Sequence, residues 1–288
     1  MTALLTLTLV LLAPVPAPAP LKWKLAKGDT FYSKSVTSLK QTVTVMGRDV
    51  EQEQEQATYN KFKVVSADDK GYVVEQMVEK SEVKGNLPGA EDAAKKMKGV
   101  MLTYTLNEKF EVMKVKGLND LLDKLAGDNE AVRKAIGGVL TEDLFAAGMG
   151  DTFRTAPDKP AKLNDKWKRA YKYPLGAGLG SLKIDAEYKY AQSSDAGDKI
   201  TYSAATKYEV GKGGGDLPFT FTKGEMTAES FTGEYVFDSQ AGRLKSHSTK
   251  AKIKGTLTLS ANGMEIEMSL KQDMNSSTIY SEKSLADD

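Results

Sequence analysis

The fold is decided by a short stretch near the end of the sequence, Leu257-Thr258-Leu259-Ser260-Ala261-Asn262-Gly263-Met264-Glu265-Ile266-Glu267-Met268. Its centre, Asn262-Gly263, suits a type I′ turn because both residues tolerate positive φ. Apolar and polar residues alternate on either side, which is the pattern of a strand with one buried face. A two-residue loop would place Leu259 opposite Ile266 and Leu257 opposite Met268. The stretch therefore predicts an antiparallel hairpin with one apolar face.

The same alternation continues along most of the chain. A second hairpin is predicted to turn at Gly47-Arg48. Its expected cross-strand pairs are Val45 with Val50, Val43 with Gln52, and Lys40 with Glu55. Four further turns are expected at residues 68–71, 106–109, 194–198 and 238–242. The strands between these turns span about 10 to 17 residues, against roughly 5–6 for an ordinary strand, and such length favours curved sheets or half-barrels over a compact sandwich.

Helices are expected mainly in the middle of the chain. Two helical stripes are predicted, formed by Leu118, Leu121, Leu122 and Leu125 and by Val132, Ala135, Ile136, Val139 and Leu140. Thr141 is a suitable N-cap for a third helix, which Gly148 and Gly150 would end. A short helix is also expected over residues 90–98.

These patterns predict a mainly β protein (α+β) with long antiparallel strands in curved sheets or half-barrels and a central helical segment. The expected organisation is a signal peptide over residues 1–20, a first β-unit over 21–116, a helical connector over 117–156 and a second β-unit over 157–288. Three collinear matches indicate a two-fold internal repeat: 28–31 with 164–167, Tyr59 with Tyr188, and 104–107 with 235–238. Repeated use of the same turn chemistry is the alternative.

The first twenty residues contain no charged side chain. Their apolar run, residues 3–13, is too short for a membrane span, which needs about 20 residues. Prolines alternate from Pro14 to Pro20, and the small-residue triplet Ala17-Pro18-Ala19 resembles a cleavage site. We therefore expect export to the periplasm or the cell exterior and no transmembrane segment. An uncleaved N-terminal anchor or a misassigned start codon is the alternative.

The composition excludes several classes of function. With no Cys, the chain has no disulfide framework, thiolate metal site or cysteine nucleophile. Its 40 Lys and Arg balance 39 Asp and Glu, so no basic surplus indicates a nucleic-acid partner. We expect no cofactor and no catalytic residue. The sequence does not indicate an oligomeric state.

The most unusual motif is the alternating Glu and Gln run over residues 51–56. On a strand it places three carboxylates on one face and three amides on the other. Gln41 would lie beside the amides if the second hairpin forms. We therefore interpret the amide face as a candidate ligand-contacting wall, formed by Gln41, Gln52, Gln54 and Gln56; a solvated surface ladder is the alternative.

The chain has a single histidine, His247. It lies between Ser246 and Ser248, with Lys245 and Lys250 nearby and no acidic neighbour in sequence. This context predicts a surface residue without a chemical role.

Several short motifs resemble those of one protein family. They are residues 21–31 (LKWKLAKGDTF), residues 41–47 (QTVTVMG) with the Glu and Gln run after them, Lys159-Pro160, and residues 165–168 (DKWK). The family consists of exported bacterial proteins that carry only a domain-of-unknown-function label. The resemblance implies an exported, β-rich protein and transfers no functional residue.

Three functions remain open from the sequence. The first is a non-enzymatic binding or structural protein of the cell envelope, with an envelope lipid or protein as its partner. Its sharper form is a carrier of a lipid or other amphipathic ligand in a concave sheet, because the long strands resemble the half-barrels of lipid carriers at the level of architecture. A carboxylate-based hydrolase is the last alternative, and it requires two carboxyl groups that converge in a cleft.

Overall fold

The computed structural model describes residues 21–153, 155–176, 178–211, 220–261 and 263–287. The expected signal peptide and Asn262 of the decisive turn lie outside these residues. Within them the elements follow in this order: β1 (Thr30–Val45), β2 (Arg48–Asp68), β3 (Gly71–Gly85), α1 (Ala90–Met97), β4 (Met101–Leu106), β5 (Val112–Lys116), α2 (Leu118–Ala126), α3 (Glu130–Val139), α4 (Glu142–Phe153), β6 (Lys166–Pro174), β7 (Gly180–Ser194), β8 (Gly197–Val210), β9 (Thr220–Asp238), β10 (Arg243–Ala261) and β11 (Met264–Ser281).

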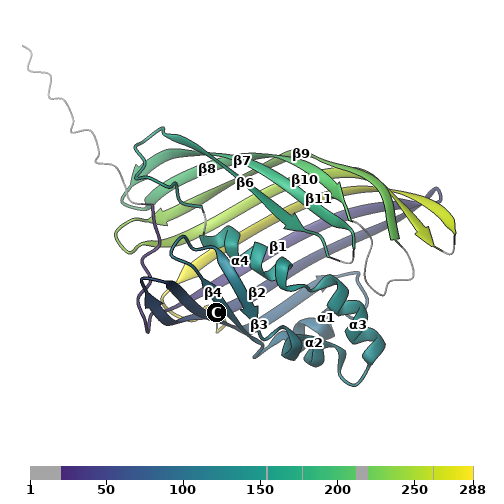
Figure 1. The fold of residues 1–288 in the computed structure, drawn as a ribbon, viewed down its shortest axis with the longest axis horizontal. Helices are drawn as coiled ribbons and strands as arrows, with labels where there is room; N and C mark the ends of the chain where they lie inside the picture. Colours follow the sequence, from purple (N-terminus) through teal and green to yellow (C-terminus); the bar gives the residue numbers. More distant parts are fainter. Residues whose placement is uncertain (1–20, 154, 177, 212–219, 262, 288) are drawn as a thin grey trace, which may run out of the picture.

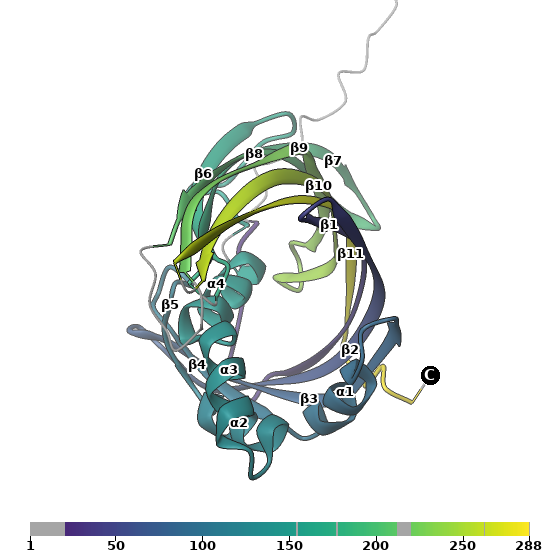
Figure 2. The same ribbon diagram turned by 90° about the vertical axis from the view of Figure 1, so that its right-hand side faces the viewer.

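All described strands belong to one antiparallel sheet, in the order β5-β4-β3-β2-β1-β11-β10-β9-β8-β7-β6. The sheet is strongly curved (Figure 1) and does not close, so β5 and β6 are its edges (Figure 2). The predicted class, mainly β with long curved antiparallel strands and a central helical segment, is confirmed. The internal repeat stays a prediction: it would equate β1, at the centre of the sheet, with β6, at an edge.

The central helices lie on the open side of the curved sheet. Figure 2 shows the sheet curling round, with α4 between the edge strands β5 and β6. The Val115 N–H on β5 donates to the Glu142 carboxylate of α4 at 2.8 Å. Because an edge strand carries unpaired backbone groups, this bond satisfies one of them and ties the helix to the edge.

The C-terminal hairpin has the register that the sequence predicted, with Leu259 opposite Ile266 and Leu257 opposite Met268. The register predicted for the β1–β2 hairpin is wrong by two residues. The loop is Met46-Gly47, and Val45 faces Arg48, Val43 faces Val50, and Lys40 faces Glu53.

The physical reason is the backbone of Met46, which takes a φ of 51°, followed by Gly47 at 76°. A non-glycine residue rarely takes positive φ, so the sequence favoured a later turn. An even shift keeps every side chain on its predicted face.

The remaining local predictions hold except one. The four further turns and the helices over residues 90–97, 118–126 and 130–139 are confirmed. Thr141 Oγ1 accepts a hydrogen bond from the Leu144 N–H at 3.3 Å, as an N-cap does. The predicted end of α4 at Gly148 and Gly150 is wrong, because the helix continues to Phe153. Met149 and Phe153 are buried in the core, and this packing outweighs the poor helix propensity of glycine.

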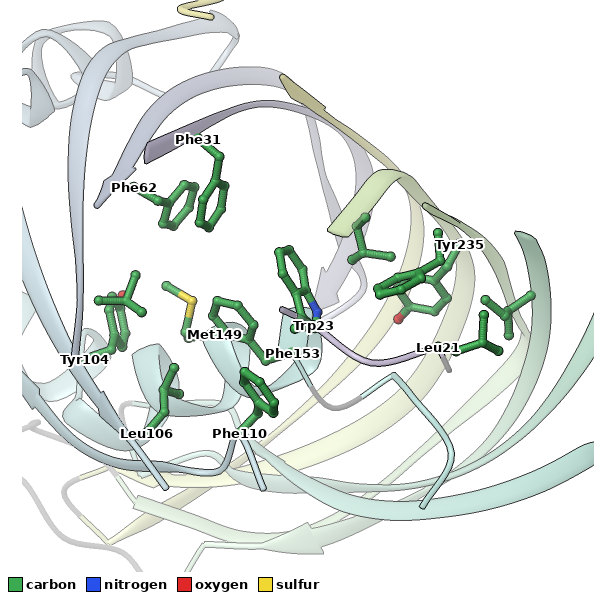
Figure 3. Packing of buried hydrophobic residues seen from close by; sticks show 14 of the residues in the cluster. Leu21, Trp23, Phe31, Phe62, Tyr104, Leu106, Phe110, Met149, Phe153 and Tyr235 are labelled. Atoms are coloured by element: carbon green, nitrogen blue, oxygen red, sulfur yellow. The ribbon is translucent and has the colours of Figure 1, made fainter. Parts of the chain in front are cut away.

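An aromatic core fills one end of the curved sheet (Figure 3). Trp23, on the segment before β1, is 3% exposed. Its ring meets Phe153 of α4 edge-on at 4.8 Å and Phe31 of β1 at 5.8 Å. The N-terminal segment and α4 are thus joined to the sheet by one cluster of rings.

Candidate functional site

The two faces of the sheet differ in charge. Phe31 and Phe62 stack at 4.8 Å inside the aromatic core, so the face that carries them is the concave one, here called inward. Side chains alternate between the faces along each strand. We compared the inward residues that face one another across the five central strands, β2, β1, β11, β10 and β9. Among those that the structure describes, Arg48 at a hairpin tip is the only charged residue.

At the other cross-strand positions of these strands the charged residues lie on the outward face, and several of them form ion pairs. These include Lys40–Glu53 at 2.9 Å, Lys252–Asp273 at 3.4 Å and Lys254–Glu229 at 2.6 Å. These residues contribute to the lining of a shallow groove of about 700 Å³. A neutralised, solvent-exposed ladder of this kind contributes little to stability.

The concave face is not filled by the protein's own core along its whole length. Beyond the aromatic core the inward side chains are only half-buried: Ser35, Thr37, Leu39, Gln41 and Val43 on β1, Gln52, Gln54, Gln56 and Thr58 on β2, and Leu270, Gln272, Met274, Ser276 and Thr278 on β11. Solvent therefore reaches an uncharged surface in which hydroxyl and amide side chains outnumber apolar ones.

One side of this surface is an apolar wall over β7 to β11. Its buried centre consists of Leu182, Ile184, Tyr208, Met226 and Leu257, with partly buried Phe221, Ile253, Met268 and Leu270 against it. The partly buried members of this wall leave apolar side chains open to solvent on the concave face.

A row of amides crosses the centre of the sheet. Gln41 of β1 lies opposite Gln52 of β2 on one side and opposite Gln272 of β11 on the other. We call these three residues the amide row. Gln54 and Gln56 occupy the next inward positions of β2, and the three glutamates of the run, Glu51, Glu53 and Glu55, are exposed on the other face.

The structure thus places the four glutamines predicted to contact a ligand, Gln41, Gln52, Gln54 and Gln56, on the inward face. It adds Gln272, which sequence reasoning missed. Their contact with a ligand stays a prediction. Gln56 Nε2 donates to Thr58 Oγ1 at 3.4 Å, whereas Gln41, Gln52, Gln54 and Gln272 form no side-chain hydrogen bond within the described chain. The only signal for Gln272 is its place in the inward alternation of the C-terminal hairpin, and the β1–β11 pairing that brings it to Gln41 is not visible in the sequence.

A belt of hydroxyls separates the amide row from the aromatic core. Ser35 Oγ and Thr278 Oγ1 are 2.9 Å apart, and Thr37 Oγ1 and Ser276 Oγ are 3.0 Å apart. These cross-strand pairs satisfy one another, so the belt adds polarity without charge.

The prediction that His247 is a surface residue is wrong. Its ring stacks on Tyr235 with centroids 4.1 Å apart. Its Nε2 lies 2.9 Å from Thr249 Oγ1 and 3.3 Å from the Tyr202 hydroxyl. Burial lowers the pKa of His247 from 6.5 to about 4, so the imidazole is neutral at pH 7. Thr249 lies two residues away on β10, but Tyr202 and Tyr235 come from β8 and β9, which local sequence cannot show.

A separate cleft of about 320 Å³ lies beside α4, with Asp151, Tyr171, Tyr188 and Arg169 in its lining. Burial, followed by the charge of Asp151, raises the pKa of Tyr171. Arg169 forms an ion pair with Asp158 at 2.8 Å.

Glu111 in the same cleft accepts a hydrogen bond from Asn107 at 2.7 Å. Two of the carboxylates that line the cleft, those of Asp158 and Glu111, are therefore engaged by neighbours, and the geometry gives no specific support to the hydrolase hypothesis. Within the described ranges, no three His, Asp or Glu residues are grouped so that they could hold a metal ion. Among the same residues no helix is both long and apolar enough to cross a bilayer.

Comparison with protein families gives a match over residues 54–242, from within β2 to the turn after β9. The chain belongs to DUF6263, a family of unknown function. The resemblance to a family that carries only such a label is confirmed, whereas export stays a prediction. The part of this DUF6263 chain that matches contains Gln54 and Gln56 and leaves the amide row outside.

No curated protein matches the DUF6263 chain in sequence. Among solved structures, a lipovitellin structure described by its lipid–protein interactions has 8% identity and a TM-score of 0.42, with 86% of this chain and 25% of that one covered. The chain thus spans about a quarter of the lipovitellin chain. An outer membrane channel from Pseudomonas putida F1 has 9% identity and a TM-score of 0.27, covering 90% and 97%. The outer membrane protein OprG from Pseudomonas aeruginosa has 7% identity and a TM-score of 0.25, covering 88% and 97%. Likenesses this weak carry no argument about function.

Proposed function

We propose that this DUF6263 protein is a non-enzymatic carrier that binds an amphipathic ligand, such as a lipid, against the concave face of its sheet. The single observation that supports the proposal is the composition of that face. Apart from Arg48 at a hairpin tip, the described inward positions of the five central strands are uncharged; the face is half-exposed and divided into an apolar wall and a polar zone of amides and hydroxyls. From the N-terminal sequence we further propose that the protein acts in the periplasm or outside the cell.

Leaving the apolar part of this face in water costs free energy. Apolar area contributes roughly 25 cal/mol per Å² when it is removed from solvent. A sequence selected for stability alone would be expected to close the edge strands over the half-buried apolar side chains, or to carry polar residues in their place. An acyl chain lying along the apolar wall would cover the same surface, and the polar zone would receive its head.

The experiment is native mass spectrometry of the protein purified from the envelope fraction of its own host. The wild type is expected to carry a bound species of lipid mass that organic solvent removes. Leu270→Glu places a charge on the apolar wall, at a half-buried position that can accept it, and this variant is expected to be isolated empty.

Lys271→Glu is the matched control, because the neighbouring residue faces outward and is exposed. It is expected to stay loaded, and thermal unfolding shows whether both variants fold. A wild type that is always empty, or one that purifies instead with a stoichiometric protein bound at a sheet edge, would contradict the carrier proposal.

A further inference from the structure

We infer that the ligand is an uncharged amphiphile and that the amide row of Gln41, Gln52 and Gln272 holds its polar group. This inference rests on the carrier function proposed above and names the chemical class of the ligand. It comes from three features of the concave face: the distribution of charge, the unused hydrogen-bonding groups, and the order of the zones along the strands.

The first feature excludes a charged head at the centre of the sheet. A charge removed from water without a partner is strongly unfavourable. The cation on the inward face of the central strands, Arg48, stands at the hairpin tip opposite Val45. It is four residues from Gln52 along β2, roughly 13 Å at about 3.3 Å per residue. A carboxylate, phosphate or ammonium at the inward side of the amide row would therefore meet no counter-charge at the neighbouring inward positions of these strands.

The second feature supplies the recognition. A glutamine amide has two N–H donors and a carbonyl acceptor. The three side chains of the amide row form no hydrogen bond within the described chain, and they lie at directly opposed positions on adjacent strands. Together they present both donors and acceptors to a hydroxyl, ester or amide group.

The third feature orients the ligand. On one side of the amide row the next inward residues are Val50, Val43 and Leu270; on the other they are Gln54, Leu39 and Met274. The row is thus bounded by apolar side chains towards the hairpin tips, and in the opposite direction Gln54, Leu39 and Met274 lie between it and the hydroxyl belt. A molecule with one uncharged polar group and an apolar chain directed towards the apolar wall matches this order.

The test is a binding titration, below the critical micelle concentration and at pH 8, with three amphiphiles that share a twelve-carbon chain. The neutral probe is glycerol monododecanoate, the anionic one dodecanoate, and the cationic one dodecyltrimethylammonium. The wild type, stripped of bound lipid, is expected to bind the neutral ester at least about tenfold more tightly than either ion.

Variants locate the polar contact. Gln272→Leu is expected to weaken binding of the neutral ester about five- to tenfold, because the head loses a hydrogen-bonding partner. Gln41→Lys is expected to reverse the preference towards dodecanoate by supplying the missing cation. Thr42→Lys is the control: it adds the same charge at the outward neighbour, and the preference should not change.

Two results separate this inference from the carrier proposal. If the wild type bound dodecanoate as tightly as the neutral ester or more tightly, the inference that the ligand is uncharged would be wrong. An unchanged preference in Gln41→Lys would have the same consequence. Neither result would contradict the proposal that the protein is a carrier. Binding of none of the three probes, together with an empty protein in native mass spectrometry, would overturn both.

Discussion

The imidazole of His247 lies flat on the ring of Tyr235, with centroids 4.1 Å apart and planes inclined by 8°. Tyr235 is 1% exposed, and the hydroxyls of Thr249 and Tyr202 are at the imidazole edge. The one histidine of the chain is therefore part of the polar layer between the aromatic core and the open part of the concave face.

This environment makes stability depend on pH. Because burial lowers the pKa of His247 to about 4 from 6.5, the unfolded chain takes up the proton first as the pH falls. The stability is fully present above about pH 6.5 and decreases between pH 6.5 and 4, by on the order of 3 kcal/mol for this group. Urea unfolding at a series of pH values measures this change in the free energy of unfolding.

His247→Gln is the matched variant, since it keeps a polar side chain without a titrating group. It is expected to lose this part of the pH dependence whatever its absolute stability. Parallel curves for wild type and variant between pH 6.5 and 4 would show that the imidazole is not buried as described.

Two glycine substitutions are expected to act in opposite directions. A Cβ on Gly233 would lie 2.5 Å from the Tyr202 ring and also meet the Ser248 carbonyl, so Gly233→Ala should destabilise the protein by about 1–3 kcal/mol. A Cβ on Gly148, on the exposed side of α4, meets nothing within 4 Å. Gly148→Ala should therefore stabilise by about 0.5–1 kcal/mol through helix propensity. Chemical denaturation measures the free energy of unfolding of both variants. Equal changes in the two would be inconsistent with the packing around Gly233 and Gly148.

Trp23 should behave as the centre of the aromatic core. Trp23→Ala removes a buried ring that contacts Phe31 and Phe153 and is expected to cost about 3–5 kcal/mol. Trp23→Phe keeps an aromatic ring and removes an indole N–H that has no hydrogen-bond partner, so it should cost less than about 1.5 kcal/mol. Thermal unfolding followed by circular dichroism distinguishes them; a similar loss for both would show that ring packing is not what matters there.

The sequence was most informative where local chemistry decides the structure. Asn262-Gly263 predicted its hairpin to the residue, and the Glu and Gln alternation predicted which side chains face inward. It was misleading at Met46, which takes a positive φ in the two-residue loop of its hairpin, and at the end of α4, where buried Met149 and Phe153 hold glycine in a helix.

Long-range pairing accounts for what was missed in the site. Gln272 joins Gln41 because β11 closes onto β1, and His247 is covered by side chains of β8 and β9. Neither contact has a signal within a few residues in the sequence. The sequence therefore predicted that amide side chains line this part of the inward face, but it could not predict every residue that contributes to it.

The central claim, that a ligand occupies the concave face, is tested most directly by thiol protection. The chain has no cysteine, so Leu270→Cys and Lys271→Cys each introduce a single thiol, one inward and one outward. The rate of reaction with a maleimide is measured with and without glycerol monododecanoate. The account predicts that the amphiphile slows the reaction at position 270 and leaves position 271 unchanged; equal rates at position 270 with and without a saturating amphiphile would contradict it.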